Sequence, residues 1–416
     1  MMNNDRSPAV ESGVCNRRTF LSATGAAVSV GLAGCSGNSG SGGSESATIG
    51  ILNPMSGDYS TLGPSQRAGA EYAIQEINNS DDYSYELEPV YYDTETTASA
   101  GSQAAQQAIQ EDGADYLVGA ISSSVALGLN ELAASEETVY FAGGAAVPIT
   151  GEQCNEWVFR FETNTAQVAE AISGYTVENI GSNVWFHYAD YAYGTSVYNR
   201  TSMRMEEASA DFSEIGQTSS SLGASNYESY ITQIGNSDAN VAVLGMTGGD
   251  LVTFVNQAAD RGLTEDVALV APTMAYKSTR AGTGSNSVGT FGGVRYDPSI
   301  DIGDNQAFVD GFQSEYDELP GSYERTGYGS VRLIAKGMER AGSTDPAEVR
   351  DTLEGGEFTT VLGDITLRET DRQATNPAWI AELTEGDGDS ADVDILSKTE
   401  GADALRPASE FGCELN

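Results

Sequence analysis

The sequence predicts an α/β protein built from two doubly wound, Rossmann-like lobes, in which helices cover both faces of a parallel sheet. Short apolar runs that fit buried strands alternate with longer segments in which apolar residues recur every three or four positions. This alternation occurs twice, once over residues 47–142 and again over 184–271. At this spacing it is typical of parallel sheets, whose ligands bind beyond the carboxyl ends of the strands.

The first series of elements opens at residue 47. Its first helix is predicted from apolar residues at i, i+3, i+4 and i+7 between Ala70 and Ile77. Strands are expected at 47–53, 87–92, 116–118 and 139–142, and the helices between them around 70–77, 104–109 and 125–134. The turns at Pro54, Ser122 and Gly143 should all lie at the carboxyl-end edge of this sheet.

The second series follows residue 158. Strands are expected at 184–188, 241–245 and 267–271, with helices at 166–180 and 249–261. Residues 292–296 are interpreted as a strand that returns to the first series. Helices near 305–316, 327–340 and 346–353 follow, then strands at 365–367 and 379–383 and an acidic, glycine-rich segment at 385–394.

One turn of the first series, Gly119–Ser124, is a candidate anion site. Three serines stand where a strand stops and a helix starts, so free backbone N–H groups, hydroxyl groups and the positive end of a helix dipole occur together. A carboxylate or another small anion suits this combination. Serine is also a favoured N-cap without any ligand, and these residues alone leave that alternative open.

The chain is strongly acidic, with 61 Asp and Glu against 20 Lys and Arg among 416 residues and a formal net charge of −41. This charge excludes binding to nucleic acids or anionic membranes through electrostatic attraction. The acidic residues are scattered along the chain, which indicates a halophilic surface adapted to high salt, where charge repulsion is screened. Disorder is rejected because apolar periodicity persists through nearly the whole chain.

The start of the chain is interpreted as an export signal and a tether. Arg17 and Arg18 form a twin-arginine pattern, and the small and apolar residues after them are too few to span a bilayer permanently. Residues 32–35 resemble a lipobox, in which cleavage after the signal peptide 1–34 leaves Cys35 as a lipid-carrying N-terminus. Residues 35–46 are then a Ser/Gly spacer. We therefore expect a lipoprotein on the extracellular face of the cytoplasmic membrane; an ordinary signal with a coincidental cysteine is the alternative.

Cys154 and Cys413 are the only two cysteines after Cys35. Disulfides persist outside the cell, so we expect these two to form one and to fasten the tail, 401–416, to a loop before Trp157. Two free buried thiols are the alternative.

Several segments together resemble the leucine/isoleucine/valine-binding family of type I periplasmic binding proteins, the solute receptors of ABC importers. They follow the family's order: an opening strand with a glycine turn, a first helix, the serine turn, and a tyrosine–glycine pair in the second lobe. In this chain they are Ile51–Gly57 with Gly63, Arg67–Asn78, Asp112–Ser124 and Tyr193–Gly194, with further similarity at 257–263 and 326–346. The resemblance covers residues 47–385.

The resemblance implies two lobes, joined by a hinge of three chain segments, that close on a small ligand without catalysis or a cofactor. The crossings are expected near Thr163, Tyr296 and 367–376. The lobes would comprise 47–163 with 297–367, and 164–296 with 376–400. The implied partners are a small-molecule ligand and an ABC permease with its ATPase. The protein should be a monomer that touches the membrane through its lipid anchor only.

The resemblance also implies which residues contact the ligand. The matching positions are Ser122, Ser123, Gly144, Ala145, Ala146, Tyr191, Tyr193, Thr247 and Thr273. The two serines would hold a carboxylate. Ala146 lacks the hydroxyl group that many members have there, so only its backbone N–H remains.

Thr273 is the departure from the family with the largest consequence. Amino-acid-binding members place a glutamate there for the ligand's ammonium group, and a buried ammonium without a carboxylate partner is costly. A branched-chain amino acid is the ligand that the family's name implies. A small organic or aromatic acid, or an amide, fits these residues at least as well. Asp190 or Asp250 could replace the missing glutamate.

An enzyme and a ligand sensor are the alternative functions. The one histidine, His187, lies in a predicted strand and is expected to be structural, and no nucleophile-elbow, zinc or P-loop pattern occurs. The aspartates of 385–394 miss the spacing of an EF-hand, so no metal site is expected. A sensor fused to its output would need a spanning helix, which the sequence after residue 35 does not show; this favours an importer receptor.

Overall fold

The computed structural model describes residues 45–413 and 415. The predicted signal peptide, the lipid-attachment residue Cys35 and the spacer up to residue 44 lie outside the described residues. Residues 45 and 46, the expected end of the spacer, are instead the first two residues of strand β1. No helix of the described chain is both long and apolar enough to cross a membrane.

The first sheet consists of parallel strands, as predicted for the first series. In spatial order they are β2 (Tyr85–Asp93), β1 (Glu45–Asn53), β3 (Tyr116–Gly119), β4 (Val139–Ala142) and β5 (Val158–Phe159). The helices of this part are α1 (Gly63–Asn78), α2 (Ala98–Gln110), α3 (Ser123–Glu136), α9 (Asn305–Tyr316), α10 (Ser322–Ala341) and α11 (Pro346–Leu353). Helix α10 packs along α1, so a segment far from α1 in the sequence completes this lobe.

The second sheet is mixed. In spatial order its strands are β14 (Ala391–Thr399), β13 (Ala378–Glu385), β10 (Phe291–Val294), β9 (Ala268–Ala271), β8 (Val241–Gly245), β6 (Asn183–Ala189) and β7 (Ser213–Ser220). Its helices are α4 (Thr165–Tyr175), α5 (Ala192–Ala208), α6 (Glu228–Gly235), α7 (Gly248–Asp260) and α8 (Lys277–Thr283). The strands β13 and β14 form an antiparallel edge, and the acidic residues 386–390 are the turn between them.

The interpretation of 292–296 as a strand that returns to the first series is wrong. Strand β10 pairs with β9 and β13 in the second sheet. Its two glycines explain the placement, because a Cβ at Gly293 would lie 2.4 Å from a methyl group of Val168, and one at Gly292 would lie 2.6 Å from Cβ of Met274. Because these two positions have no side chain, helix α4 and the turn after β9 can pack directly against the backbone of β10.

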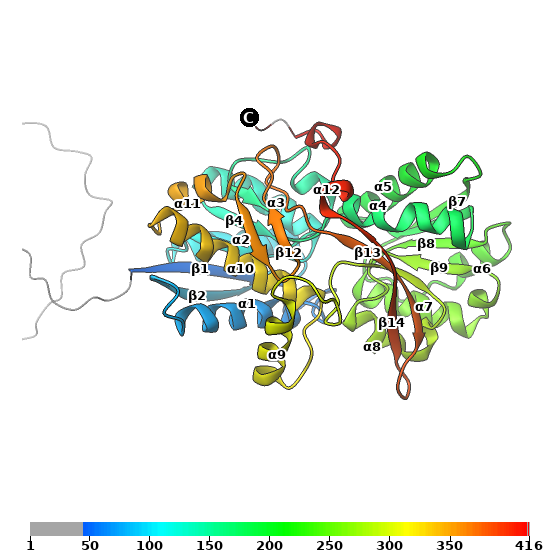
Figure 1. Cartoon of the computed structure of the whole chain (residues 1–416). Helices are drawn as coiled ribbons and strands as arrows, with labels where there is room; N and C mark the ends of the chain where they lie inside the picture. Colours follow the sequence, from blue (N-terminus) through cyan, green and yellow to red (C-terminus); the bar gives the residue numbers. More distant parts are fainter. Residues whose placement is uncertain (1–44, 414, 416) are drawn as a thin grey trace, which may run out of the picture. The chain divides into compact units, whose positions relative to one another are not determined.

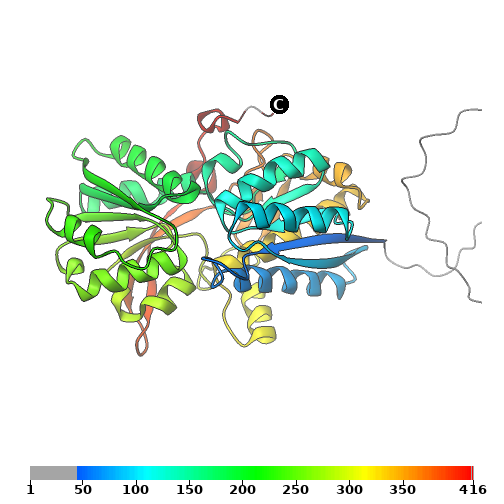
Figure 2. The ribbon, with the colours of Figure 1, turned by 180° about the vertical axis from the view of Figure 1, so that it is seen from behind.

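A small hairpin stands outside both large sheets. It pairs β11 (Glu357–Thr360) with β12 (Gly363–Thr366), and β12 is the strand predicted at 365–367. Figure 1 shows the two large sheets apart, with the blue-to-cyan strands of the first and the green strands of the second, and Figure 2 shows the same separation from behind.

The chain passes between the two sheets three times: after β5, after β10, and between β12 and β13. The first and third crossings are bonded to each other. Arg160 and Gln373 form an isolated parallel bridge, and the backbone N–H of Ala374 donates to the carbonyl of Arg160 at 3.0 Å. Both side chains of the bridge are buried.

The predicted disulfide is confirmed: Cys154 and Cys413 are bonded, with Cα atoms 5.8 Å apart. The tail reaches this point through α12 (Gly401–Ala404), which packs against α4. Near its end, Phe411 is buried against Val147 and Ala166, which lie on opposite sides of the first crossing. The tail therefore contacts the chain on both sides of the hinge.

Candidate functional site

The serine turn lies at the carboxyl end of β3, as predicted, and its backbone is tightly constrained. Gly119 has φ of +127°, and a Cβ there would lie 2.0 Å from the carbonyl oxygen of Leu52, so only glycine fits. Ser122 is the N-cap of α3, but its side chain makes no cap hydrogen bond, and its buried Oγ has no hydrogen-bond partner among the described residues. The second serine, Ser123, is buried and accepts a hydrogen bond from the N–H of Ala146 at 3.1 Å.

The loop after β4 is held from behind by Arg160. Its Nη1 donates to the carbonyl oxygens of Ala146 at 2.6 Å and Gly144 at 3.3 Å. The next residue, Val147, donates its N–H to Ser196 Oγ of helix α5 at 3.0 Å. These bonds fix the loop beside the serine turn. The N–H of Ala146 was expected to face a ligand, but it is bonded to Ser123 Oγ.

A cavity lies where the carboxyl ends of strands from both sheets meet. Its lining residues come from turns after β1, β3, β4, β6, β8, β9 and β10 and from the starts of α5 and α10. They are Tyr59, Ile121, Gly143, Ala145, Tyr191, Tyr193, Thr247, Thr273, Arg295 and Tyr323. The cavity volume of about 20 Å³ holds water but no organic acid, so a larger ligand requires the lobes or the lining tyrosines to move.

The structure brings together five of the nine residues matched from the sequence. These lining residues are Ala145, Tyr191, Tyr193, Thr247 and Thr273. The other four, Ser122, Ser123, Gly144 and Ala146, are buried beside the cavity and do not line it. Three of them support the wall of the cavity from behind: Ser123 is bonded to Ala146, and the carbonyl groups of Gly144 and Ala146 are bonded to Arg160.

Sequence reasoning missed three large lining residues: Tyr59, Arg295 and Tyr323. A signal existed for the first two. Tyr59 belongs to the turn after the first strand, and Arg295 follows two glycines at the end of a predicted strand in a chain that has few basic residues. Nothing in the sequence marked Tyr323, which reaches the cavity because α10 begins at Ser322, five residues before its predicted start.

Tyrosines from both parts of the chain meet across this cavity. The hydroxyl groups of Tyr59 and Tyr191 are in hydrogen-bond contact, and their rings stand edge to face with centroids 6.2 Å apart. Tyr323 Oη lies 3.3 Å from Thr247 Oγ1 in a second contact of the same kind. Burial raises the pKa of Tyr59 and Tyr191 well above the usual value, so both are neutral at physiological pH.

Neither aspartate considered as a partner for an ammonium group lines the cavity. Asp190 is exposed. Asp250 is buried and accepts hydrogen bonds from the N–H of Gly223, with both carboxylate oxygens at 3.1 Å. Burial raises the pKa of Asp250 to about 6. The lining residues include no Asp or Glu, and the one charged side chain among them is that of Arg295.

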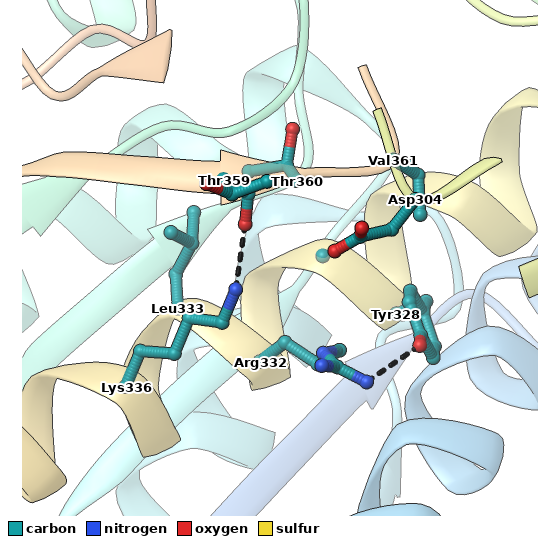
Figure 3. Close-up of a pocket in the computed structure, with 9 residues that line it drawn as sticks. Asp304, Tyr328, Arg332, Leu333, Lys336, Thr359, Thr360 and Val361 are labelled. Carbon is teal, nitrogen blue, oxygen red and sulfur yellow. Dashed lines mark hydrogen bonds between the residues drawn. The ribbon is translucent and has the colours of Figure 1, made fainter. Parts of the chain in front are cut away.

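A second cavity lies in the first lobe alone, between α10 and the β11–β12 hairpin (Figure 3). Its two basic side chains already have partners. Lys336 Nζ donates to the carbonyl of Thr359 at 2.6 Å, and Arg332 Nη1 donates to Tyr328 Oη at 2.7 Å (Figure 3). This cavity is therefore explained by the attachment of the hairpin to α10.

The described chain contains no group of three or more His, Cys, Asp or Glu side chains that could hold a metal ion. The one histidine, His187, is fully buried, with Nδ1 2.8 Å from Thr218 Oγ1 and its ring stacked on Phe254. It lies outside the cavity lining, and its burial and contacts fit the expectation that it is a structural residue.

Comparison with known proteins agrees with this architecture. The family model described as "Periplasmic binding protein" matches residues 46–389. The chain is 26% identical over 331 residues to the Leu/Ile/Val-binding protein homolog 3 of Brucella melitensis biotype 1, covering 78% of this chain and 87% of that protein.

Solved structures show the same fold. An amino acid ABC transporter substrate-binding protein from Pseudomonas fluorescens Pf-5 superposes with a TM-score of 0.80 at 22% identity, covering 89% of this chain and 99% of that one. A solute-binding protein of an ABC transporter from Rhodopseudomonas palustris HaA2, in complex with p-hydroxybenzoic acid, gives 0.79 at 20% identity, covering 88% and 98%. The chain thus belongs to the periplasmic binding protein family, in its leucine/isoleucine/valine-binding-like, type I branch.

Proposed function

We propose that this protein captures a small carboxylate-bearing solute between its two lobes and delivers it to an ABC permease and its ATPase. The observation that carries the proposal is the cavity at the carboxyl ends of both sheets, lined from both sides of the hinge. A site shared between two lobes couples ligand binding to their closure, because the ligand contacts both at once only when they are together.

The lobes are proposed to comprise 47–163 with 297–367, and 164–296 with 376–400. The two large sheets support this division, since every strand of each sheet falls within one of the two parts apart from the first two residues of β1. The ligand contacts are proposed to be the lining residues of the cavity. The two serines of the turn act one layer behind them, where Ser123 fixes the loop that carries Ala145.

The family's name suggests a branched-chain amino acid, but the lining residues favour a ligand without an ammonium group. A zwitterionic amino acid would bring a positive charge into a cavity that has no carboxylate to receive it. The structural relative bound to p-hydroxybenzoic acid shares this fold, which therefore accommodates ligands of that kind. We place small organic and aromatic acids ahead of amino acids.

Export by the twin-arginine pattern and lipid attachment at Cys35 complete the proposal. A lipid-anchored monomer outside the cytoplasmic membrane would hold its ligand site close to a permease. The disulfide between Cys154 and Cys413 supports an oxidising location. Mass spectrometry of the N-terminal peptide from cells of the source organism tests the anchor, with a diacylated cysteine at position 35 as the expected result.

A ligand screen tests the proposed function. The purified chain is heated in high salt with amino acids, organic acids and amides, one at a time. A ligand that binds only the folded form raises the unfolding midpoint by mass action, so at least one carboxylate should do so. A panel in which amides or sugars raise the midpoint and no carboxylate does would contradict the proposal.

A further inference from the structure

Arg295 has one edge of its guanidinium group without a charged partner. The side chain is 3% exposed and lines the cavity. Nη1 donates to Glu162 Oε1 at 2.6 Å, whereas neither Nε nor Nη2 makes a hydrogen bond of ordinary geometry to a described residue; the guanidinium also interacts with the uncharged hydroxyl of Tyr193. Nε and Nη2 share an edge, where two parallel N–H groups match the spacing of the two oxygens of a carboxylate.

The buried charges around Arg295 have an excess of positive charge, which also favours an anionic ligand. Among the described residues, Glu162 is the one carboxylate within ion-pair distance of Arg295, at 2.6 Å, and it also faces Arg325 at 3.8 Å. All three side chains are buried. Two guanidinium groups therefore share one carboxylate, and this in a chain whose net charge is −41. A buried positive charge without a counter-charge is unfavourable, and a ligand carboxylate on the free edge would supply the missing one.

Four tyrosines provide the aromatic part of the lining, and no lining residue other than Arg295 is charged. Tyr59, Tyr191, Tyr193 and Tyr323 line the cavity, and the ring of Tyr276 lies under the guanidinium of Arg295, 5.7 Å from ring centroid to Cζ. Tyrosine rings pack well against a planar aromatic ring, edge to face or offset. The buried hydroxyl of Tyr193 interacts with Thr273 and Arg295 but makes no hydrogen bond of ordinary geometry to a described residue, which leaves it able to bond a polar substituent of the ligand.

We propose that Arg295 anchors the carboxylate of an aromatic acid through Nε and Nη2, and that it sets the specificity of the cavity against zwitterionic amino acids. This inference rests on the proposed function and names its substrate class. In this arrangement Glu162 holds the guanidinium in place through Nη1, and the tyrosines enclose the ring of the ligand. The amine of an amino acid would share the cavity with Arg295, and the two positive charges would repel each other.

The test is calorimetric titration of the full chain with sodium benzoate, benzamide and leucine. Benzamide has the shape of benzoate without its charge, so wild-type protein should bind benzamide and leucine at least tenfold more weakly than benzoate. Arg295→Lys keeps the positive charge but loses the two parallel N–H groups. It should weaken benzoate binding at least tenfold and change benzamide binding little. Arg204→Lys is the matched control, because Arg204 is a buried, ion-paired arginine outside the cavity lining; it should leave the affinity for benzoate unchanged.

The outcomes separate the inference from the proposed function. Equal binding of benzoate by wild type and a folded Arg295→Lys overturns the role of Arg295 and leaves the carboxylate-binding function standing. Tighter binding of leucine than of benzoate overturns the substrate class in the same way. Failure to bind benzoate, leucine or any other carboxylate overturns both. If Arg295→Lys does not fold, the wild-type comparison decides alone, since equal affinity for benzoate and benzamide contradicts the inference.

Discussion

The hydroxyl groups of Tyr59 and Tyr191 meet across the cavity, one from the turn after β1 and the other from the residue before α5. They belong to different sheets, so their contact joins the two sides of the ligand site. Any movement that admits a ligand must alter this contact or the lobes that carry it. The pair is therefore a sensitive place to test how the site opens.

Tyr191→Phe removes one hydroxyl group of this pair and keeps the ring. The contact belongs to the form whose cavity is too small for an organic acid, and a hydrogen bond contributes roughly 0.5–1.5 kcal/mol net, so the variant should open more readily and bind its ligand up to about tenfold faster. Stopped-flow association measurements check this. Tyr188→Phe is the control, since the hydroxyl of Tyr188 bonds Gln217 at the surface, and its association rate should match wild type. Unchanged association for Tyr191→Phe would show that the contact does not hold the empty site closed.

Ser123→Ala tests the support of the loop after β4. The substitution leaves the buried N–H of Ala146 without its acceptor, which costs about 1–3 kcal/mol in the free energy of unfolding. The free energy of ligand binding should weaken by a similar amount, because the loop no longer holds Ala145 firmly in the cavity wall. Denaturant titration and calorimetry measure the two effects separately. A loss of affinity with full stability would instead place Ser123 in direct contact with the ligand.

The disulfide should contribute strongly to stability. It closes a loop with a sequence separation of 259 residues, and constraining the unfolded chain in this way is worth about 2–5 kcal/mol. Cys413→Ser should lower the free energy of unfolding by this amount. A reducing agent should then destabilise wild type and leave Cys413→Ser unaffected. Equal stability of the two proteins without reductant would show that the bond does not form in solution.

His187 provides a clean pH probe because the chain has no second histidine. Burial lowers the pKa of His187 to about 4. Its NMR signals should therefore not titrate between pH 7 and pH 5. The unfolded chain takes up this proton near pH 6.5, so the contribution of His187 to stability is intact above that pH and falls as the pH drops towards 4, by about 3 kcal/mol in all. A midpoint near 6.5 in the folded protein would contradict the burial.

Salt dependence tests the proposed adaptation to high salt. A net charge of −41 repels itself, and screening shortens the reach of this repulsion from about 10 Å at 0.1 M salt to about 3 Å at 1 M. The unfolding midpoint should therefore rise with potassium chloride across this range. A midpoint that stays constant or falls would show that surface charge does not limit stability.

Elements with strong periodicity were predictable from the sequence. Helix α1 and strands β3 and β4 occur where the apolar pattern places them. The helix buries one apolar face, and every residue of the two strands is buried. Strand β7 was not predicted. Its sequence is polar and it forms the edge of the second sheet. Few of its side chains are buried there, so no alternation of apolar residues marks the strand in the sequence. The partners of β10 could not be predicted either, since they depend on close packing against Val168 and Met274.

The candidate site was predictable only where a turn signals it. The turns at Ala145, Tyr191 and Thr247 follow strands and could each be placed at the carboxyl-end edge of the sheet to which that strand belongs. Tyr323 reaches the cavity because of where α10 begins, which no local pattern encodes. Arg295 has a local signal, but its place in the cavity depends on the pairing of β10 in the second sheet. The resemblance to the family supplied candidate positions, but it could not show that the serine turn supports the wall from behind it.

A crystal structure of the protein with a bound carboxylate ligand tests the central claim most directly. We expect the ligand between the two lobes, in contact with Tyr59 from one side and Tyr193 from the other, with its carboxylate facing Arg295. A ligand held by one lobe alone, or in the cavity beside Lys336 on the first lobe, would contradict it.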